Sequence, residues 1–308
     1  MVSRRIQRML AIVLGLTALL AVSPAQAQSQ ALVGILQGSA VLVRQTTRHA
    51  LAEGAALVEG DIAETAAGAF MQIEFDDGAI VAVGENSRLI LKPRLTGLKT
   101  VGAPRAYLLE GWMKVSLPSK PQAGFDLLSP QFELDVKAGA AVVRVQAKAY
   151  AVFVEGGSAR LVLRDAARTT LALKAGDFAM QAPTADKPVV SARLSPEFLQ
   201  QLPRLFRDPL PARAALFEKR VVTLQTLGPL DYGHVTAWLH SEPALRLALS
   251  KQWRGRASDK AFRAEVAANL AAHMEWERVI FPERFLPKKP PEPRPSDPAT
   301  PASAPASP

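Results

Sequence analysis

The chain contains no cysteine among its 308 residues. Disulfide bonds, a lipid-modified cysteine and a cysteine nucleophile are therefore excluded. The stability of the fold must come from the burial of apolar side chains. A chain of this length can bury a sufficient core.

Histidine is scarce as well, with four copies in the chain. His234 and His240 are six residues apart, which places them on different faces of one helix, unlike the i, i+4 pair of a helical zinc site. His49 stands alone in a polar connection. His273 and Glu277 do have the i, i+4 spacing, but one such pair is common by chance. The histidines therefore do not predict a metal site.

Motifs of the common enzyme classes are also missing. The sequence has neither a Gly-x-Ser-x-Gly elbow nor a phosphate-binding glycine loop. Together with the absence of cysteine, this favours a protein that is not an enzyme and that needs no cofactor.

The N-terminal residues have the features of an export signal. Three arginines precede the unbroken apolar run "MLAIVLGLTALLAV", which is fourteen residues long. A helix that spans a membrane needs ~20 apolar residues. The following Ala25-Gln26-Ala27 has the small-x-small pattern of a signal peptidase site.

We therefore expect residues 1–27 to be a signal peptide, cleaved between Ala27 and Gln28. Cleavage would place the mature protein in the periplasm with no membrane span. The alternative is a protein anchored in the inner membrane by an uncleaved signal.

Residues 28–183 are dominated by short runs in which apolar residues alternate. In "AFMQIEF", Met71, Ile73 and Phe75 share one face of a predicted strand. Asp77-Gly78 then gives a strong signal for a two-residue hairpin before "AIVAV". Many such runs separated by turn residues predict a mainly β domain, either an antiparallel sandwich or a rolled sheet.

The pattern changes to helical periodicity after a predicted linker at residues 184–194. Ser195-Pro196-Glu197 is typical of a helix start, and Phe262, Val266, Leu270 and Met274 recur at four-residue intervals. We expect residues 195–286 to form a small all-α segment. Residues 287–308 are proline-rich and predict a disordered tail.

Six carboxylates lie between Gly60 and Leu89, namely Asp61, Glu64, Glu74, Asp76, Asp77 and Glu85. One hypothesis is a metal loop or a pair of catalytic acids. However, Asp76 and Asp77 are adjacent and run directly into strand residues, so their side chains would point to opposite faces. The pattern favours turn-forming residues of a β-sheet.

The formal net charge is +9, and loss of the three signal arginines leaves +6. Export weakens a nucleic-acid interpretation of this charge, so anionic envelope polymers or lipid head groups become the expected partners. A basic cluster surrounds Trp253: Lys251, Arg254, Arg256, Lys260 and Arg263. It is a candidate surface for anionic ligands. The favoured interpretation is a solvated loop with Trp253 turned into the core.

Residues 28–183 contain a motif of glycine, leucine, Gly-Asp, isoleucine and threonine, followed by a downstream hairpin: Gly54, Leu57, Gly60, Asp61, Ile62 and Thr65, then Asp77-Gly78. On these residues the segment resembles the FecR domain family. The resemblance implies a periplasmic, all-β, non-catalytic domain. In the founding regulators this domain relays a signal from an outer-membrane receptor to a sigma factor.

Those regulators carry a cytoplasmic segment before their membrane helix. Here about eight residues precede the apolar run, so we expect a free exported relative rather than a transmembrane regulator. Three function classes follow. The first is an exported binding or interaction module in envelope sensing or signalling, with an envelope protein or anionic polymer as partner. The second is a structural protein that contacts peptidoglycan or lipopolysaccharide through its basic helices. The third is an uncharacterised enzyme.

Overall fold

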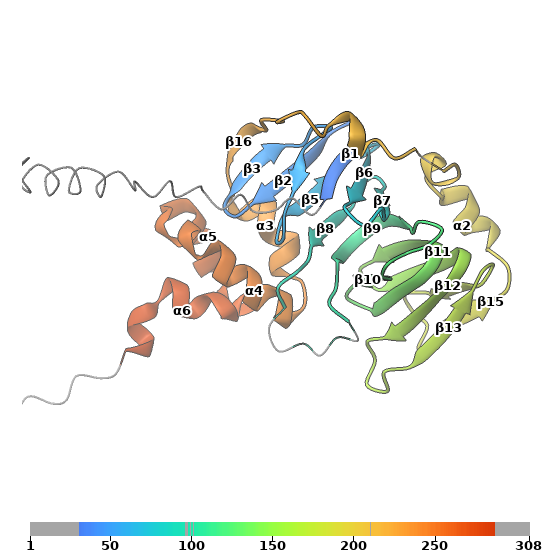
Figure 1. Ribbon diagram of the computed structural model, residues 1–308. Helices are drawn as coiled ribbons and strands as arrows, with labels where there is room; N and C mark the ends of the chain where they lie inside the picture. Colours follow the sequence, from blue (N-terminus) through green and yellow to red (C-terminus); the bar gives the residue numbers. More distant parts are fainter. Residues whose placement is uncertain (1–30, 96–97, 99, 101, 210, 287–308) are drawn as a thin grey trace, which may run out of the picture.

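The computed structural model describes residues 31–95, 98, 100, 102–209 and 211–286 (Figure 1). The predicted signal peptide and the predicted proline-rich tail lie outside these residues. Within the described part, no helix combines the length and the apolarity that a membrane crossing requires.

Residues 31–191 and a later short segment form the β part of the molecule. Its strands are β1 (Ala31–Gln37), β2 (Ala40–Arg44), β3 (Thr47–Ala50), β4 (Ala56–Leu57), β5 (Ile62–Thr65), β6 (Phe70–Phe75), β7 (Ile80–Val83), β8 (Arg88–Leu91), β9 (Ala106–Ser116), β10 (Phe125–Leu128), β11 (Phe132–Gln146), β12 (Ala149–Leu163), β13 (Thr170–Lys174), β14 (Phe178–Gln181), β15 (Val189–Ser191) and β16 (Gln225–Pro229). The mainly β fold class predicted from the sequence is confirmed.

The described strands belong to one sheet, whose main path runs β15-β14-β12-β11-β10-β9-β8-β5-β2-β3-β16. Strands β1, β4, β6 and β7 form a branch, and β13 extends the edge beside β12. The pairings among these strands are antiparallel except for β9 with β10, which is parallel.

The sheet rolls because its long strands exchange partners along their length. The first half of β9 pairs with β8 and β10, and the second half pairs with β7 and β11. Gly111 lies between the two halves with a φ of +103°, next to an irregularity in the β8 register. A Cβ atom there would lie 2.4 Å from the Cα of Ser87, so this bend requires glycine. The main core, built largely of aliphatic residues, lies inside the roll.

The hairpin between β6 and β7 differs in one detail from the prediction. The amide of Phe75 donates a hydrogen bond to the carbonyl of Ala79. The amide of Gly78 donates to the carbonyl of Phe75 at 2.9 Å. The loop therefore contains three residues, 76–78, instead of two. Gly78 has a φ of +82°, the left-handed conformation that closes a three-residue hairpin.

The helical elements are α2 (Pro196–Gln201), η1 (Arg204–Phe206), η2 (Ala214–Leu216), α3 (Tyr232–Leu239), α4 (Pro243–Trp253), η3 (Arg254–Ser258), α5 (Lys260–Ala268), η4 (Leu270–Ala272), η5 (Met274–Trp276), α6 (Glu277–Ile280) and η6 (Pro282–Phe285). The helix start at Ser195 is confirmed, since its side chain accepts a hydrogen bond from the amide of Phe198.

The predicted four-residue stripe is realised only in part. Phe262 and Val266 are buried on α5, but the helix ends at Ala268 and short 3-10 turns follow. Met274 is consequently 68% exposed instead of packed. The change from a 3.6-residue to a three-residue repeat rotates Met274 away from the core.

The predicted boundaries also differ at two strands. Val189–Ser191, within the predicted linker, forms β15 and pairs with β14. Gln225–Pro229, within the predicted all-α segment, forms β16 and pairs with β3. Both strands satisfy their backbone groups at a free sheet edge, an opportunity that side-chain periodicity does not reveal.

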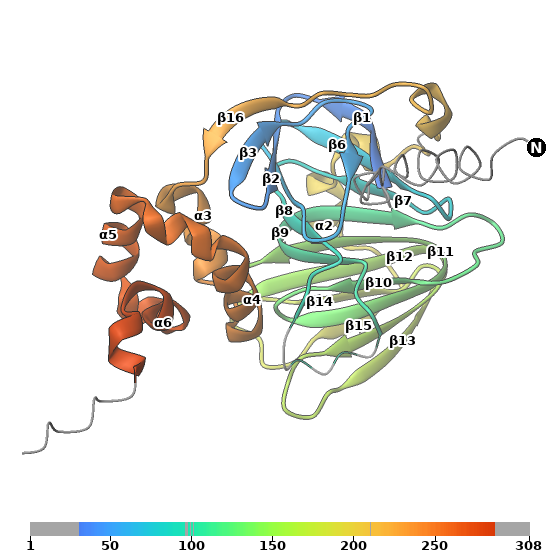
Figure 2. The same cartoon turned by 60° about the vertical axis from the view of Figure 1, so that its left-hand side comes forward.

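Helices α3 to α6 gather on one side of the rolled sheet (Figure 2). A second apolar core joins the two parts. It combines sheet residues such as Val43, Ile62 and Tyr107 with helical residues such as Trp238 and Trp253. The division into a β domain and a separate helical segment stays a prediction.

Candidate functional site

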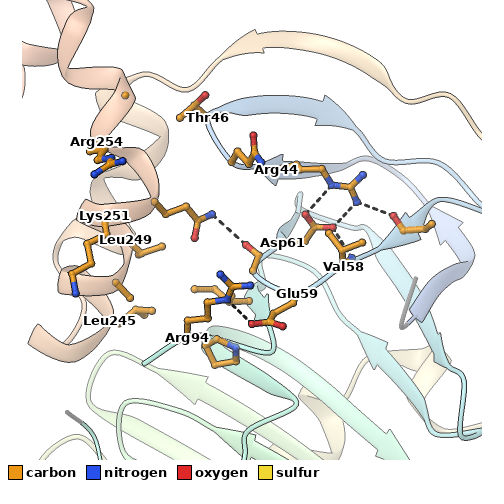
Figure 3. A pocket seen from close by; sticks show the side chains of 18 residues that line it. Arg44, Thr46, Val58, Glu59, Asp61, Arg94, Leu245, Leu249, Lys251 and Arg254 are labelled. Carbon is orange, nitrogen blue, oxygen red and sulfur yellow. Dashed lines mark hydrogen bonds and ion pairs between the residues drawn. The ribbon is translucent and has the colours of Figure 1, made fainter. Parts of the chain in front are cut away.

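An open groove lies between the sheet and helix α4 (Figure 3). Its volume is about 1470 Å³. One wall is formed by residues 44–46, 56, 58–61, 90 and 93–94, and the other by residues of α4 and the first turn of η3. We call this cleft the α4 groove.

Arg44, at the end of β2, is fixed in the sheet wall by a buried acid. Its Nε and Nη2 atoms donate to the two carboxylate oxygens of Asp61 at 2.9 and 2.6 Å, and Nη2 also donates to the carbonyl of Ala56. The hydrogen bonds that Arg44 donates to Asp61 raise the pKa of Arg44 above its usual value. Asp61 also accepts the amide of Val58 at 2.9 Å. Arg44 is therefore a permanently charged, rigid part of the groove.

Arg94 and Glu59 form a second, more exposed pair on the same wall. The Nε atom of Arg94 donates to Oε1 of Glu59 at 2.5 Å, and the arginine side chain is 80% exposed. This contact uses only one edge of the guanidinium group. The two Nη groups remain available for a ligand.

Helix α4 is held against the sheet by its apolar face. Pro243 occupies the first turn, and Leu245, Leu249 and Trp253 follow at four-residue intervals and are buried. Gln252 reaches across, and its Nε2 atom donates to the carbonyl of Gly60 at 3.3 Å. This spacing leaves Ala248, Lys251, Gln252 and Arg254 along the groove.

The structure separates the five basic residues that the sequence grouped together. Lys251 and Arg254 are exposed and line the α4 groove. Lys260 is exposed but does not line it. Their role in ligand binding stays a prediction.

The other two basic residues hold the helical part together. The Nε atom of Arg256 donates to the carbonyl of Leu230 at 2.6 Å, and its guanidinium lies 5.6 Å from the ring of Phe262. Arg263 donates to the carbonyl of Ile280. Trp253 is fully buried, as the favoured interpretation of the cluster expected.

Most of the six clustered carboxylates make hydrogen bonds that shape the fold. Asp61 binds Arg44, Glu64 accepts from Trp238, Asp77 pairs with Arg105, and Glu85 accepts the amide of Gly68. Asp76 is exposed in the hairpin. Among the described residues, no group of three or more histidine or acidic side chains is arranged to hold a metal ion.

Glu74 has a role that the sequence gave no means to predict. It is 5% exposed on β6, and its carboxylate accepts the amides of Arg213 and Ala214 at 2.8 Å. Those amides belong to the connection between α2 and β16, which passes over the sheet (Figure 1). Glu74 therefore fixes the segment that leads to the helices.

The histidines remain apart except for one pair. His49 lies on β3, and His234 contacts Asp231 and Arg48. The rings of His240 and His273 are 5.0 Å apart. Burial lowers the pKa of His273, and the nearby His240 and Arg246 lower it further.

The fold and the groove define a mainly β domain with a helical appendage packed on one side. Residues 61–164 of the chain match the FecR protein family model. The resemblance identified from the sequence is thereby confirmed for these residues. The match includes Asp61, Ile90 and Arg94 of the sheet wall but not Arg44 or α4.

Two crystal structures of a "putative anti-sigma factor" from Parabacteroides distasonis ATCC 8503 are similar to part of the chain. Both are 14% identical, with TM-scores of 0.35 and 0.36. The similarity covers 43% of this chain and 59% of each of those chains. No curated protein matches the chain.

Arg44, Arg94 and Gln252 were not among the site residues predicted from the sequence. Asp61 in the FecR-like motif was the available signal, because an acid that is buried at the start of a strand requires a basic partner. The identity of that partner depends on the pairing of β2 with β5, which places Val43 opposite Ile62.

Proposed function

We propose that this protein is an exported, non-enzymatic binding module of the bacterial cell envelope that takes part in sensing or signalling. The FecR domain at residues 61–164 is the observation that carries the proposal. The carboxylates clustered near its start support a non-enzymatic role. Asp61 and Asp77 each hold an arginine, so their charges serve the fold.

Export is part of the proposal. The arginine-rich start, the apolar run and Ala25-Gln26-Ala27 support it. Protein purified from the periplasm should begin at Gln28, which intact-mass spectrometry would measure. An intact Met1 on membrane-bound protein would favour the anchored alternative instead.

The binding role is tested by photo-crosslinking in living cells. A photoreactive residue is placed in turn at three exposed positions of the β part: Ala56, Ala66 and Thr170. A discrete protein adduct at one position and not at the others supports an interaction module. The absence of adducts at all three positions contradicts it.

A structural envelope protein is the second candidate. The exposed cations Lys251, Arg254 and Lys260 favour it, since they could contact peptidoglycan or lipopolysaccharide. Sedimentation of the mature protein with either material, in a manner that falls with added salt, would support this candidate. Crosslinks exclusively to a polymer would favour it over the interaction module.

A further inference from the structure

Acidic residues balance the positive charges on only one wall of the α4 groove. The described lining residues include four basic ones, Arg44, Arg94, Lys251 and Arg254, and two acidic ones, Glu59 and Asp61. Both acids are already paired with arginines of the sheet wall. Within the described part of the chain, no carboxylate pairs with Lys251 or Arg254. The excess positive charge therefore lies on the helical wall.

The groove also carries an aliphatic strip between these charges. Val58 and Pro93 contribute half-buried surface to it from the sheet side, and Ala248 contributes from α4. Ile90, Leu245 and Leu249 also border the groove but are almost fully buried. A ligand that matches this lining combines negative charge with aliphatic groups.

Among the lining residues that the structure describes, none has an aromatic side chain. Saccharide rings are commonly held on aromatic faces, and the bases of single-stranded nucleic acids stack on them. An extended peptide has a different requirement. Its side chains alternate between two directions, so that acids and aliphatic residues can face different parts of one groove.

We infer that the α4 groove binds an acidic peptide segment of a partner protein. The cations of the two walls bind the carboxylates, and the strip between them holds the aliphatic side chains. Arg94 lies on the sheet wall, and Lys251 and Arg254 lie on the helical wall opposite it (Figure 3). This inference rests on the proposed function, because it names the kind of partner for the same binding module.

The test uses the full mature protein and a fluorescent peptide of alternating glutamate and leucine as the probe. Fluorescence anisotropy measures its binding at low and at high salt. A matching peptide with glutamine in place of glutamate is the control ligand. We expect the acidic peptide to bind, more weakly at high salt, and the glutamine peptide to bind at least about tenfold more weakly.

Charge-reversed variants locate the site. Lys251→Glu with Arg254→Glu should weaken binding of the acidic peptide at least about tenfold, because charge-assisted hydrogen bonds are lost and repulsion replaces them. Lys148→Glu with Lys174→Glu makes the same change in net charge at exposed positions outside the groove, and it should leave binding nearly unchanged. If the charge reversals unfold the end of α4, the milder double variant Lys251→Gln with Arg254→Gln is measured in their place.

Three results would overturn the inference. One is equal loss of binding in the groove variant and in the control variant. The second is equal binding of the acidic and glutamine peptides. The third is no peptide binding together with groove-dependent sedimentation of lipopolysaccharide or peptidoglycan, which would assign the groove to a polymer. A protein adduct that still forms in cells would leave the proposed function standing, so the two failures can be told apart.

Discussion

The indole nitrogen of Trp238 donates a hydrogen bond to Oε1 of Glu64 at 2.7 Å. These residues are 174 positions apart, on α3 and β5. Arg164, just after β12, makes a two-point contact with Glu242, the residue that directly precedes α4. The helices are therefore tied to the β part by polar contacts as well as by the second apolar core.

The contact between Glu64 and Trp238 should be measurable by a double-mutant cycle. Trp238→Phe removes the donor, and Glu64→Ala removes the acceptor. Each single change should lower the free energy of unfolding by about 1–3 kcal/mol, because each removes the hydrogen bond and Glu64→Ala also leaves the buried indole N–H of Trp238 unpaired. Chemical denaturation measures all four proteins. We expect a coupling energy of at least about 0.5 kcal/mol, and strictly additive effects would contradict a direct bond.

Removal of residues 231–286 tests how far the two parts depend on each other. The truncation uncovers Val43, Ile62, Ile90, Tyr107 and Leu128, which are buried in the shared core. The shortened protein should melt at a lower temperature and bind a hydrophobic dye. Removal of residues 287–308 alone is the control and should change neither property. An unchanged melting temperature after the larger truncation would favour the separate domains predicted from the sequence.

Asp76 and Asp77 are neighbours in one hairpin but have different surroundings. Arg105 binds both carboxylate oxygens of Asp77 at 2.7 and 2.9 Å and lies over the rings of Phe75 and Phe125. Asp77→Asn should therefore lower the free energy of unfolding by about 1 kcal/mol or more. Asp76→Asn, at an exposed position, should stay within about 0.5 kcal/mol. Equal effects in thermal denaturation would contradict this assignment.

His273 should make the helical part sensitive to acid. Its Nε2 atom lies 2.8 Å from the hydroxyl of Tyr232, and Nδ1 lies 3.1 Å from the carbonyl of Leu239. Burial first, and then the charges of His240 and Arg246, hold its pKa below the usual value. The unfolded chain therefore binds a proton more readily than the folded protein. Stability should be complete above pH ~6.5 and should fall as the pH drops below it.

The charged groups around His273 include one acid, Glu275, which weakens the effect of Arg246 on the pKa of His273. Arg246 also pairs with Glu275 at 2.8 Å, so its charge is partly balanced. His273→Gln should flatten the dependence of the melting temperature on pH between about 5 and 7. His49→Gln, on β3 outside the helical part, is the matched control and should retain the wild-type slope. The same slope in both variants would exclude His273 as the source.

Local patterns predicted most of the fold, and long-range pairing accounts for what they missed. Alternating residues such as Met71, Ile73 and Phe75 identified the strands, and Ser195 identified a helix start. Strands β15 and β16 were missed because they are added at sheet edges through backbone bonds. Their side chains are mostly exposed, so they leave no alternating apolar signature.

The candidate site was even harder to predict from the sequence than the fold. Lys251 and Arg254 were found as a charge cluster, but the sheet wall opposite them lies about 160 to 210 positions earlier in the chain. The cluster also contained Arg256 and Arg263, whose guanidinium groups are used inside the helical part. The sequence shows that a residue is charged, but it does not show which atom the charged group bonds.

Some residues of the basic cluster are exposed and others make bonds inside the helical part, and this difference can be tested directly. Arg256 bonds the carbonyl of Leu230 and pairs with Asp259 at 3.5 Å, and its side chain is 15% exposed. Arg256→Gln should therefore lower the free energy of unfolding by about 1–2 kcal/mol, because the carbonyl of Leu230 loses a charged donor. Lys260→Gln, four residues away and exposed, should stay within about 0.5 kcal/mol.

Binding of the acidic peptide should depend on the exposed residues of the cluster and not on Arg256. Arg254→Gln should weaken binding of the acidic peptide while leaving the melting temperature unchanged, because its side chain lines the groove and is exposed. Arg256→Gln should lower the melting temperature but retain binding below the unfolding transition, since its guanidinium is directed to the protein interior. Denaturation and anisotropy on the same preparations measure both properties. If both variants changed stability and binding alike, the division of the cluster into groove and structural residues would be wrong.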